Sequence, residues 1–498
     1  MDLVTLLEMA AAGHGDRIAV GGARPVTTAE LADLSARAAA SVRKVGADRL
    51  ALLDVTSVAF PVALFGAACA GVPFAPLNYR LAASRLEALV DRLEPALVVH
   101  GTTHVAGRTG PSAATGAWLD SLAALEPVDV LPADPDAVAV LLFTSGTTAE
   151  PKAAVLRHRH LASYVIQSVE FGGAGEEEAS LLSLPPYHIA GVANVITSIY
   201  AGRRIVPLPD FTARGWLETA AAESITHAVV VPTMLARIVD EMEADPSLRV
   251  PSLRSLAYGG AAMPSGVIER ALELFDDVDF VNAYGLTETS STIAVLGPDD
   301  HRAAKKGDAV ALTRLSSCGK PLPGIEVQIR DEDGTALPRG KHGNVWVRGE
   351  QVSGEYDGLA SPLDAQGWFP ARDIGWLDAE GYLYLGGRTD DVIIRGGENI
   401  APIEIEEVLL RHPAVAECAV FGVADDQWGE RIAAVVVLRD GTTVEVEELR
   451  SHVRGELRSS KTPDLVEFRT ELPYTETGKL LRRVLHAEIT GQLTADTP

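Results

Sequence analysis

Apolar runs alternate with amphipathic stretches along roughly the first 380 residues. Residues 137–143 (AVAVLLF) and 228–231 (AVVV) are continuous apolar runs, typical of strands that are buried on both faces of a sheet. Residues 256–258 lead into a pair of glycines, and residues 264–275 (PSGVIERALELF) predict an amphipathic helix with proline in its first turn. Strands that alternate with helices predict an α/β architecture with parallel-rich sheets.

The pattern changes after Trp376. Residues 381–385 (GYLYL) alternate like a half-exposed strand, and residues 386–391 (GGRTDD) form a polar, glycine-rich break. Beyond the break the pattern predicts a helix with an acidic start at 402–411, apolar strands at 415–423 and 432–438, and a helix near 446–457. We therefore expect a large N-terminal domain over residues 1–387, a hinge over residues 388–391 and a small α+β C-terminal domain over residues 392–498.

One stretch, residues 55–79, has no charged side chain and is long enough to span a bilayer. Three prolines and two glycines interrupt it. We therefore expect a buried helix near residues 61–70, a turn at Gly71 and a short strand rather than a membrane span. Residues 101–132 are rich in small and polar side chains and are expected at the surface.

Composition narrows the class of protein. Lys and Arg number 43 against 68 Asp and Glu, and the net charge of −25 disfavours a broad nucleic-acid surface or a hold on anionic lipid. A hydrophobic fraction of 47% excludes general disorder. The three cysteines lie far apart without metal-ligand spacing, and the first 15 residues lack the basic region of a secretory signal. These features predict a cytoplasmic protein.

The first candidate for chemistry is the sequence FTSGTTAEPKAAV at residues 143–155. A predicted buried strand runs into five small residues and a lysine, namely Thr144, Ser145, Gly146, Thr147, Thr148 and Lys152. Backbone N–H groups and hydroxyls can surround an anion here, and the lysine adds a positive charge. The spacing is not that of the common P-loop. The pattern predicts a phosphate-binding loop, with a polar surface loop as the alternative.

Four further motifs follow that loop: YGLTE at 284–288, GWF at 367–369 with Asp373, YLYLGGRTDDVIIRGGEN at 382–399, and TGK at 477–479. Together and in this order, the five motifs resemble those of the adenylate-forming superfamily, which comprises acyl-CoA synthetases, non-ribosomal adenylation domains and firefly-type luciferases. The resemblance covers nearly the whole chain and is greatest to acyl-CoA synthetases. It implies the adenylate-forming fold with a mobile C-terminal domain, and ATP, Mg²⁺ and CoA as reactants.

Adenylation joins a carboxylate to the α-phosphate of ATP and releases pyrophosphate. Both reactants are anions, so an enzyme must screen charge and align the attack. The resemblance implies that residues 144–152 hold the β- and γ-phosphates and that Glu288 helps to bind Mg²⁺. It also implies that Thr287 donates to the α-phosphate or the carboxylate, and that Lys479 stabilises the charge developing between them.

The resemblance also implies a nucleotide site. Tyr284 offers a ring on which adenine can stack, Asp373 can accept bonds from both ribose hydroxyls, and Arg388 can reach ribose or phosphate. The alternatives are a core aromatic residue, a capping aspartate and a surface ion pair. The other candidates for ATP or AMP binding are Gly260, Ala261, Ala262, Asn282, Ala283 and Gly285.

Members of the superfamily turn the C-terminal domain about the hinge and form a thioester in the same site. Asp390 matches the hinge position, and Arg395, Gly396 and Gly397 would line the tunnel for the thiol of CoA. His188, in PPYHIAG, resembles a residue at the acyl and thiol entrance; a buried histidine on a packed turn is the alternative. We do not expect His188 to act as a general base.

The predicted acyl pocket is lined by small or apolar residues. Its members are His188, Ala190, Gly191, Ala193, Pro232, Tyr258, Gly259 and Ile293. The segments that carry them offer no aspartate for an amino group and no Arg or Lys for a second carboxylate. A hydrophobic monocarboxylic acid is therefore expected, with room for a bulky one. Fatty, aromatic and polycyclic acids all remain open.

Some positions depart from the superfamily pattern. Ala149 and Ala153 stand where glycine is usual, and Ala371-Arg372 replaces Thr-Gly before Asp373. If position 149 needs a positive φ, alanine costs about 1 kcal/mol there. Arg372 brings a bulky cation beside the predicted ribose site.

The predicted function is that of an AMP-forming acyl-CoA synthetase. An acyl-AMP ligase that loads an acyl carrier protein is the alternative among enzymes. A non-catalytic acyl- or nucleotide-binding protein is the alternative of another class, but the presence of Glu288, Asp373 and Lys479 argues against it.

Overall fold

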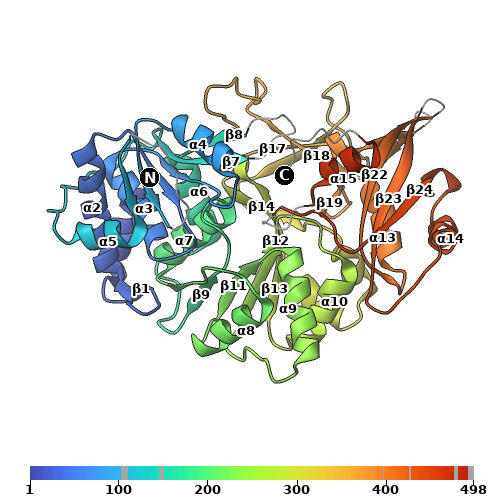
Figure 1. The fold of residues 1–498 in the computed structure, drawn as a ribbon, viewed down its shortest axis with the longest axis horizontal. Helices are drawn as coiled ribbons and strands as arrows, with labels where there is room; N and C mark the ends of the chain where they lie inside the picture. Colours follow the sequence, from blue (N-terminus) through green and yellow to red (C-terminus); the bar gives the residue numbers. More distant parts are fainter. Residues whose placement is uncertain (102–109, 145–150, 396–397, 426–427, 476–479, 492–498) are drawn as a thin grey trace.

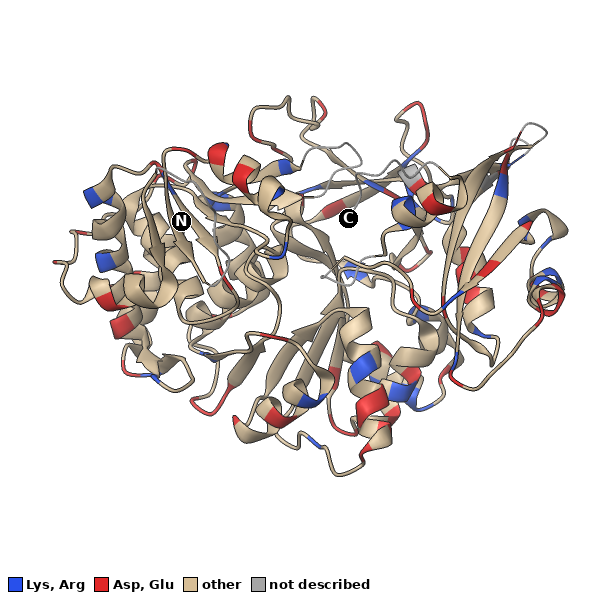
Figure 2. Cartoon of the chain, viewed as in Figure 1, with Lys and Arg blue, Asp and Glu red and all other residues tan. Residues whose placement is uncertain are grey.

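The computed structural model describes residues 1–101, 110–144, 151–395, 398–425, 428–475 and 480–491. Within these residues the chain forms four sheets, three in the N-terminal part and one in the C-terminal part (Figure 1). Acidic and basic residues are interspersed over the outer helices (Figure 2).

The first sheet has, in the described residues, the strand order β6-β5-β3-β4-β7-β8. Its strands are β3 (Arg49–Leu53), β4 (Phe74–Pro76), β5 (Ala96–His100), β6 (Ser112–Ala114), β7 (Val138–Thr144) and β8 (Lys152–Arg157). Its pairings are parallel except that between β7 and β8. The predicted apolar strand at 137–143 is β7, and its residues 139–142 are buried as expected.

Helices pack around this sheet and against one another. They are α1 (Leu3–His14), α2 (Thr28–Val45), α3 (Ala59–Ala70), α4 (Ala83–Asp91), α5 (Thr115–Leu122), α6 (His158–Ser168) and α7 (Ile189–Ala201). The uncharged stretch forms the buried helix α3, which ends at Gly71 in the left-handed conformation and leads into β4, as predicted. No helix in the described ranges is long and apolar enough to cross a membrane.

Residues 101–132 differ from the prediction of a surface segment. The described part contains β6 and α5, and α5 buries Trp118 and Leu122. The Trp118 indole N–H donates to Ser41 Oγ at 3.1 Å. Two large apolar residues four positions apart place one face of this otherwise polar helix against α2.

The second and largest sheet has the order β15-β14-β13-β12-β11-β9-β10-β1-β2 in the part of the chain that is described. Its strands are β1 (Ile18–Val20), β2 (Val26–Thr27), β9 (Ala179–Leu182), β10 (Arg204–Pro207), β11 (His227–Val230), β12 (Ser255–Gly259), β13 (Asp279–Leu286), β14 (Ser291–Leu296) and β15 (Lys320–Pro321). The central strands run parallel, and the pairings beyond β13 and β1 are antiparallel. The expected parallel-rich architecture is confirmed.

The helices of this part are α8 (Ala213–Ala222), α9 (Pro232–Ala244), α10 (Ser265–Leu274), α11 (Pro298–Lys305) and α12 (Ala309–Arg314), with a 3₁₀ turn, η1, at Thr287–Thr289. Helix α10 is the helix predicted at 264–275. Pro264 is its N-cap residue rather than part of its first turn, with an extended backbone at ψ 132°.

The third sheet is antiparallel, with the order β16-β17-β18-β19. Its strands are β16 (Glu326–Arg330), β17 (Gly343–Arg348), β18 (Phe369–Leu377) and β19 (Leu383–Arg388). The glycine-rich break predicted at 386–391 begins later than expected, because Gly387 and Arg388 still pair with β18. A 3₁₀ turn, η2 (Thr389–Asp391), follows at the predicted hinge.

The fourth sheet belongs to the C-terminal unit and pairs β21, β20, β23 and β22 in that order, with β24 beside β23. Its strands are β20 (Ile393–Arg395), β21 (Glu398–Ile400), β22 (Val415–Asp425), β23 (Gly429–Leu438) and β24 (Leu465–Arg469). Its helices are α13 (Pro402–Leu410), α14 (Val446–Glu456) and α15 (Arg482–Ile489), with a 3₁₀ turn, η3, at Ser459–Lys461.

Both faces of this sheet are covered, which explains its continuous apolar runs. Cys418 and Val420 of β22 pack with residues of α13 and α14, whereas Ala419 and Phe421 pack with Leu485 of α15. The predicted α+β succession of strands and helices is present.

Candidate active site

The segments predicted to line the acyl pocket follow the carboxyl ends of neighbouring parallel strands. His188 follows β9, Pro232 follows β11, and Gly259 ends β12, with residues 260–262 after it. Register places Val230 beside Tyr258, and Gly259 beside Ala283 of β13. In open α/β sheets this edge is where ligands bind. The topology therefore brings the predicted segments together.

Three predicted nucleotide residues form one hydrogen-bonded cluster. The Tyr284 hydroxyl donates to Asp373 Oδ2 at 2.5 Å, and the Arg388 guanidinium donates to Asp373 Oδ1 at 3.2 Å. Asp373 and Arg388 are cross-strand partners on β18 and β19. Burial, together with the Asp373 carboxylate, raises the pKa of Tyr284 well above its usual value. Tyr284 therefore stays a neutral donor, and Asp373 is held in place from two sides.

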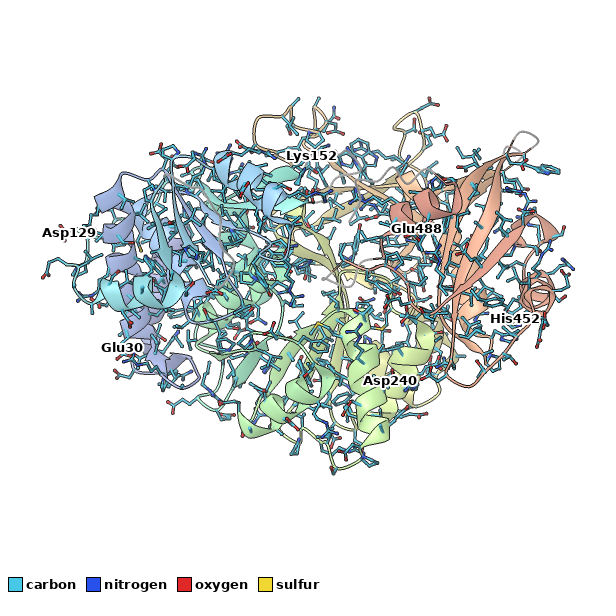
Figure 3. All side chains as sticks on the ribbon, viewed as in Figure 1. Glu30, Asp129, Lys152, Asp240, His452 and Glu488 are labelled. Carbon is cyan, nitrogen blue, oxygen red and sulfur yellow. The ribbon has the colours of Figure 1, made fainter. Side chains whose placement is uncertain are left out.

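A second cluster surrounds Glu288. The Tyr356 hydroxyl donates to Glu288 Oε1 at 2.6 Å, and Lys152 Nζ lies 5.6 Å from the centre of the Tyr356 ring. Lys152 is the first residue of β8 and is labelled in the upper central part of Figure 3. Thr144 pairs with Lys152 across β7 and β8, and its hydroxyl donates to the Lys152 carbonyl at 3.3 Å. Tyr356 was not predicted as a site residue, because its segment carries no periodic or compositional signal.

Several predicted residues lie outside the described ranges, namely Ser145, Gly146, Thr147, Thr148, Ala149, Gly396, Gly397 and Lys479. Their roles stay predictions. The backbone of Asp390 lies in η2.

His188 is the N-cap residue of α7. Its Nδ1 accepts a hydrogen bond from the Ala190 N–H at 3.2 Å, so that nitrogen carries no proton. Burial lowers the pKa of His188 to about 4. His188 is therefore neutral near neutral pH, and its side chain is held in place as the cap of α7. These properties suit a residue that lines the pocket better than one that exchanges protons near neutral pH.

Three predicted pocket residues occupy the hydrophobic core instead of an open surface. Tyr258 is fully buried, and its hydroxyl bonds His301 Nε2 at 2.8 Å. Ala193 is 3% exposed, and Ile293 is fully buried. For Tyr258 the reason is strand alternation, because Leu256 and Tyr258 lie on the face of β12 that packs against residues of α9 and α10.

Other predicted site residues are more exposed to solvent. Ala190 and Gly259 are half-buried, and residues 260–262 are exposed. Gly259 cannot accept a side chain, because a Cβ there would lie 2.1 Å from the Ala283 carbonyl oxygen. Gly260 adopts a φ of +86°, which favours glycine. Backbone therefore approaches the candidate site closely at this strand end. The neighbouring Asn282 side chain donates to the Ser317 carbonyl at 3.0 Å.

Arg395, predicted in the CoA tunnel, is held within the C-terminal unit. Its guanidinium donates to Asp464 Oδ1 at 2.8 Å and to the Ser460 carbonyl at 3.0 Å. It also lies 5.6 Å from the ring centre of Trp428, which is 46% exposed.

Comparison with known proteins assigns this architecture to a family. The family model of the AMP-binding enzyme matches residues 7–357, and that of the AMP-binding enzyme C-terminal domain matches residues 404–479. The chain belongs to the AMP-binding enzyme family.

Similar members of this family are ligases. The chain is 33% identical over 485 residues to feruloyl-CoA synthase of an Amycolatopsis species, covering 94% of this chain and 95% of the relative. It is 31% identical over 494 residues to the fatty acid–[acyl-carrier-protein] ligase ScoC of Streptomyces coeruleorubidus, covering 94% and 92%.

A similar protein of known structure is also a CoA ligase. The o-succinylbenzoate CoA synthetase MenE of Bacillus subtilis, in complex with its acyl-adenylate intermediate, matches with a TM-score of 0.85 at 29% identity, covering 96% of this chain and 97% of that one. The same enzyme has also been solved with ATP and a magnesium ion. The chain therefore has the adenylate-forming fold and is an AMP-forming acid–thiol ligase, a class that uses ATP, Mg²⁺ and CoA.

The residues present fit a magnesium ion that is shared with a nucleotide. Across the described ranges, no group of three or more His, Cys, Asp or Glu could hold a metal ion by itself. Mg²⁺ is commonly held by one or two carboxylates together with substrate phosphates. The Glu288 carboxylate supplies that donor chemistry, and Mg²⁺ bound there would neutralise phosphate charge.

Arg372 is strained where members of the AMP-binding family usually have glycine. It is exposed and has a φ of +58°, in the left-handed region. We expect Arg372→Gly to raise the free energy of unfolding by about 1 kcal/mol, because glycine adopts this conformation without strain. Urea unfolding measures the change. Arg339→Gly, at an exposed position with no positive φ, is the control, and a loss of stability in Arg372→Gly would contradict the strain argument.

Proposed function

We propose that this chain activates a hydrophobic monocarboxylic acid as acyl-AMP, releases pyrophosphate and transfers the acyl group to CoA. The observation that carries the proposal is the pair of clusters Tyr284–Asp373–Arg388 and Lys152–Tyr356–Glu288. The segments predicted to line the acyl pocket contain no charged side chain that could pair with an amino group or a second carboxylate of the acid. The similarity to a feruloyl-CoA synthase, which is named for an aromatic acyl group, supports a hydrophobic acid.

The site residues divide the reaction between them. Asp373 and Arg388 hold the ribose and Tyr284 packs on the adenine. Lys152, with the loop before it, binds the β- and γ-phosphates. Glu288 would hold Mg²⁺, which would supply positive charge that neutralises the phosphates, while Thr287 donates to the reacting oxygens. Lys479 stabilises the transition state of adenylation, and residues 395–397 guide the thiol.

We propose that two domains alternate about the hinge, with boundaries at residues 1–387, 388–391 and 392–498. The separate family models for residues 7–357 and 404–479 support this division. Asp391, the last residue of η2, lies 3.6 Å from the Arg482 guanidinium of the C-terminal unit. The cytoplasm is the proposed compartment, and the three free cysteines support it.

A carrier protein is the second candidate acceptor. The similarity to ScoC, a ligase that is named for an acyl carrier protein, favours it. Both candidates share the first half-reaction and differ only in the thiol.

One assay separates these possibilities. A panel of fatty, aromatic and dicarboxylic acids is incubated with enzyme and MgATP, and pyrophosphate and AMP are measured with no thiol, with CoA and with a phosphopantetheinylated carrier protein. Turnover that rises with CoA supports the synthetase, and turnover that rises only with the carrier supports the alternative. ATP binding without pyrophosphate release for any acid would contradict both.

Replacing Asp373 with asparagine tests the nucleotide assignment. The amide keeps the size of the side chain but accepts weaker bonds from the ribose hydroxyls, so we expect the KM for ATP to rise about tenfold, within the 1–3 kcal/mol typical of bonds to charged groups. The relative rates with different acids should stay unchanged. Asp364→Asn, which removes a carboxylate paired with Arg330, is the matched control. A shift in acid preference at constant ATP KM would contradict the assignment.

A further inference from the structure

Tyr356 contacts two groups that the proposed function assigns to the triphosphate. Its hydroxyl donates to Glu288 Oε1 at 2.6 Å, and its ring lies 5.6 Å from Lys152 Nζ. A hydroxyl that donates to a carboxylate forms a strong, charge-assisted bond. A ring beside an ammonium attracts it through its π-electrons. One side chain therefore restrains an anion and a cation that are 136 positions apart in the sequence.

The backbone on either side of Tyr356 is fixed to both of these neighbours. The N–H of Ser353 donates to the Glu288 carbonyl at 2.8 Å. Tyr356 forms an antiparallel bridge with Ala154 of β8, and the N–H of Asp357 donates to the Ala153 carbonyl at 2.8 Å. The segment 353–357 thus connects the turn that carries Glu288 to the strand that begins at Lys152.

Further bonds make this connection rigid. Glu355 forms a two-pronged ion pair with Arg157 of β8, at 2.7 and 3.0 Å. The fully buried Gln351 donates to the carbonyls of Thr289 and Thr292 at 3.0 and 2.8 Å.

We propose that Tyr356 is a positioning residue that sets the Glu288 carboxylate for Mg²⁺ through its hydroxyl and the Lys152 ammonium for phosphate through its ring. The inference rests on the proposed roles of Glu288 and Lys152. Tyr356 then makes two separate contributions to ATP binding. Its hydroxyl affects only the part of the affinity that depends on Mg²⁺, whereas its ring affects the affinity with or without the metal.

Tyr356→Phe removes the hydroxyl and keeps the ring. The dissociation constant of ATP is measured by calorimetry with saturating Mg²⁺ and again in EDTA, without any acid. Loss of a bond to a charged group typically changes an equilibrium about tenfold. We expect the affinity gained from Mg²⁺ to fall about tenfold, and the affinity in EDTA to stay within about twofold. Tyr356→Leu should also weaken binding in EDTA, by about two- to fivefold.

Tyr382→Phe is the matched control. The Tyr382 hydroxyl also donates to a carboxylate, Asp300, at 3.1 Å, and its ring also faces cations, with Arg314 at 4.2 Å and Lys320 at 4.7 Å. Tyr382 and Asp300 lie outside the proposed site, so Tyr382→Phe should leave the dissociation constant of ATP unchanged both with Mg²⁺ and in EDTA. Thermal unfolding of each variant reports any loss of fold.

Combination with Glu288→Gln gives a second test. If the Tyr356 hydroxyl acts through Glu288, adding Tyr356→Phe to Glu288→Gln should cause little further loss of the ATP affinity gained from Mg²⁺. Unchanged Mg²⁺ dependence in Tyr356→Phe, or an equal loss with and without the metal, would overturn the inference.

Failure of the proposed function can be distinguished from failure of the inference about Tyr356. Wild-type protein that binds MgATP but releases no pyrophosphate with any acid would contradict the function and leave the positioning of Glu288 measurable. Wild-type protein that gains no ATP affinity from Mg²⁺ would contradict the assignment of Glu288 and the inference together.

Discussion

Lys479→Ala is expected to slow acyl-adenylate formation by about 10²–10³-fold, the loss typical of one preorganised contact to a transition-state charge. The lysine would meet the carboxylate and the α-phosphate only while the C-terminal domain is in its adenylating position. Conversion of supplied acyl-AMP to acyl-CoA should therefore continue at a rate close to that of the wild type. Pyrophosphate release measures the first step, and thioester formation from synthetic acyl-AMP measures the second.

Lys341→Ala is the control for this comparison, since it removes an exposed lysine of the N-terminal part and should leave both steps intact. Equal loss of both steps in Lys479→Ala would argue against two positions of the domain.

The C-terminal unit has a connection that suits such a movement. Arg482, the first residue of α15, forms an ion pair with the buried Glu406, in which its Nη2 donates to both carboxylate oxygens at 2.6 and 2.7 Å. The same guanidinium lies 3.6 Å from Asp391 in the proposed hinge. The helix that follows residue 479 is therefore tied both to the core of its own unit and to the segment about which the unit would turn.

Much of the fold could be predicted because burial on both faces leaves a simple mark in the sequence. The apolar run at 137–143 became β7, and the run at 415–423 became part of β22, whose two faces are covered by helices. Helix α5 was missed because few apolar residues hold it in place, the buried Trp118 and Leu122 and the partly buried Leu119, within a segment of small and polar residues. The start of the glycine-rich break was placed too early because glycine pairs do not exclude strand pairing at Gly387.

The candidate site was predictable only where a motif marked it. Tyr284 and Asp373 lie 89 positions apart, and the resemblance to a family, not periodicity, identified them as partners in one site. Tyr258 shows the limit of that approach, because the side of β12 on which a residue lies depends on strand alternation and not on its nearness to a motif. Tyr356 carries no signal at all, since its contacts with Glu288 and Lys152 exist only after two loops and a strand come together.

Hydrophobic monocarboxylic acids are expected to exceed dicarboxylates and amino acids by at least about 10²-fold in kcat/KM. The segments that follow β9, β11 and β12 present Ala190, Pro232 and Gly259, and none of these can pair with a second charge. A buried, unpaired charge costs several kcal/mol, and each 1.36 kcal/mol in the barrier is a factor of ten. Initial rates of pyrophosphate release over a matched acid series measure the preference.

The size of the pocket is tested at Ala190 rather than at Ala193. Ala193 is 3% exposed in the core of α7, where phenylalanine would overpack the helix and destabilise the fold. Ala190 is half-buried beside His188, so Ala190→Phe should fill acyl volume and reduce kcat/KM for bulky acids more than for short ones. Ala190→Ser, which adds little volume, is the control. A profile led by malonate, acetate or an amino acid would contradict the hydrophobic preference, and unchanged selectivity in Ala190→Phe would place residue 190 outside the pocket, because a ring in contact with the acid must discriminate by size.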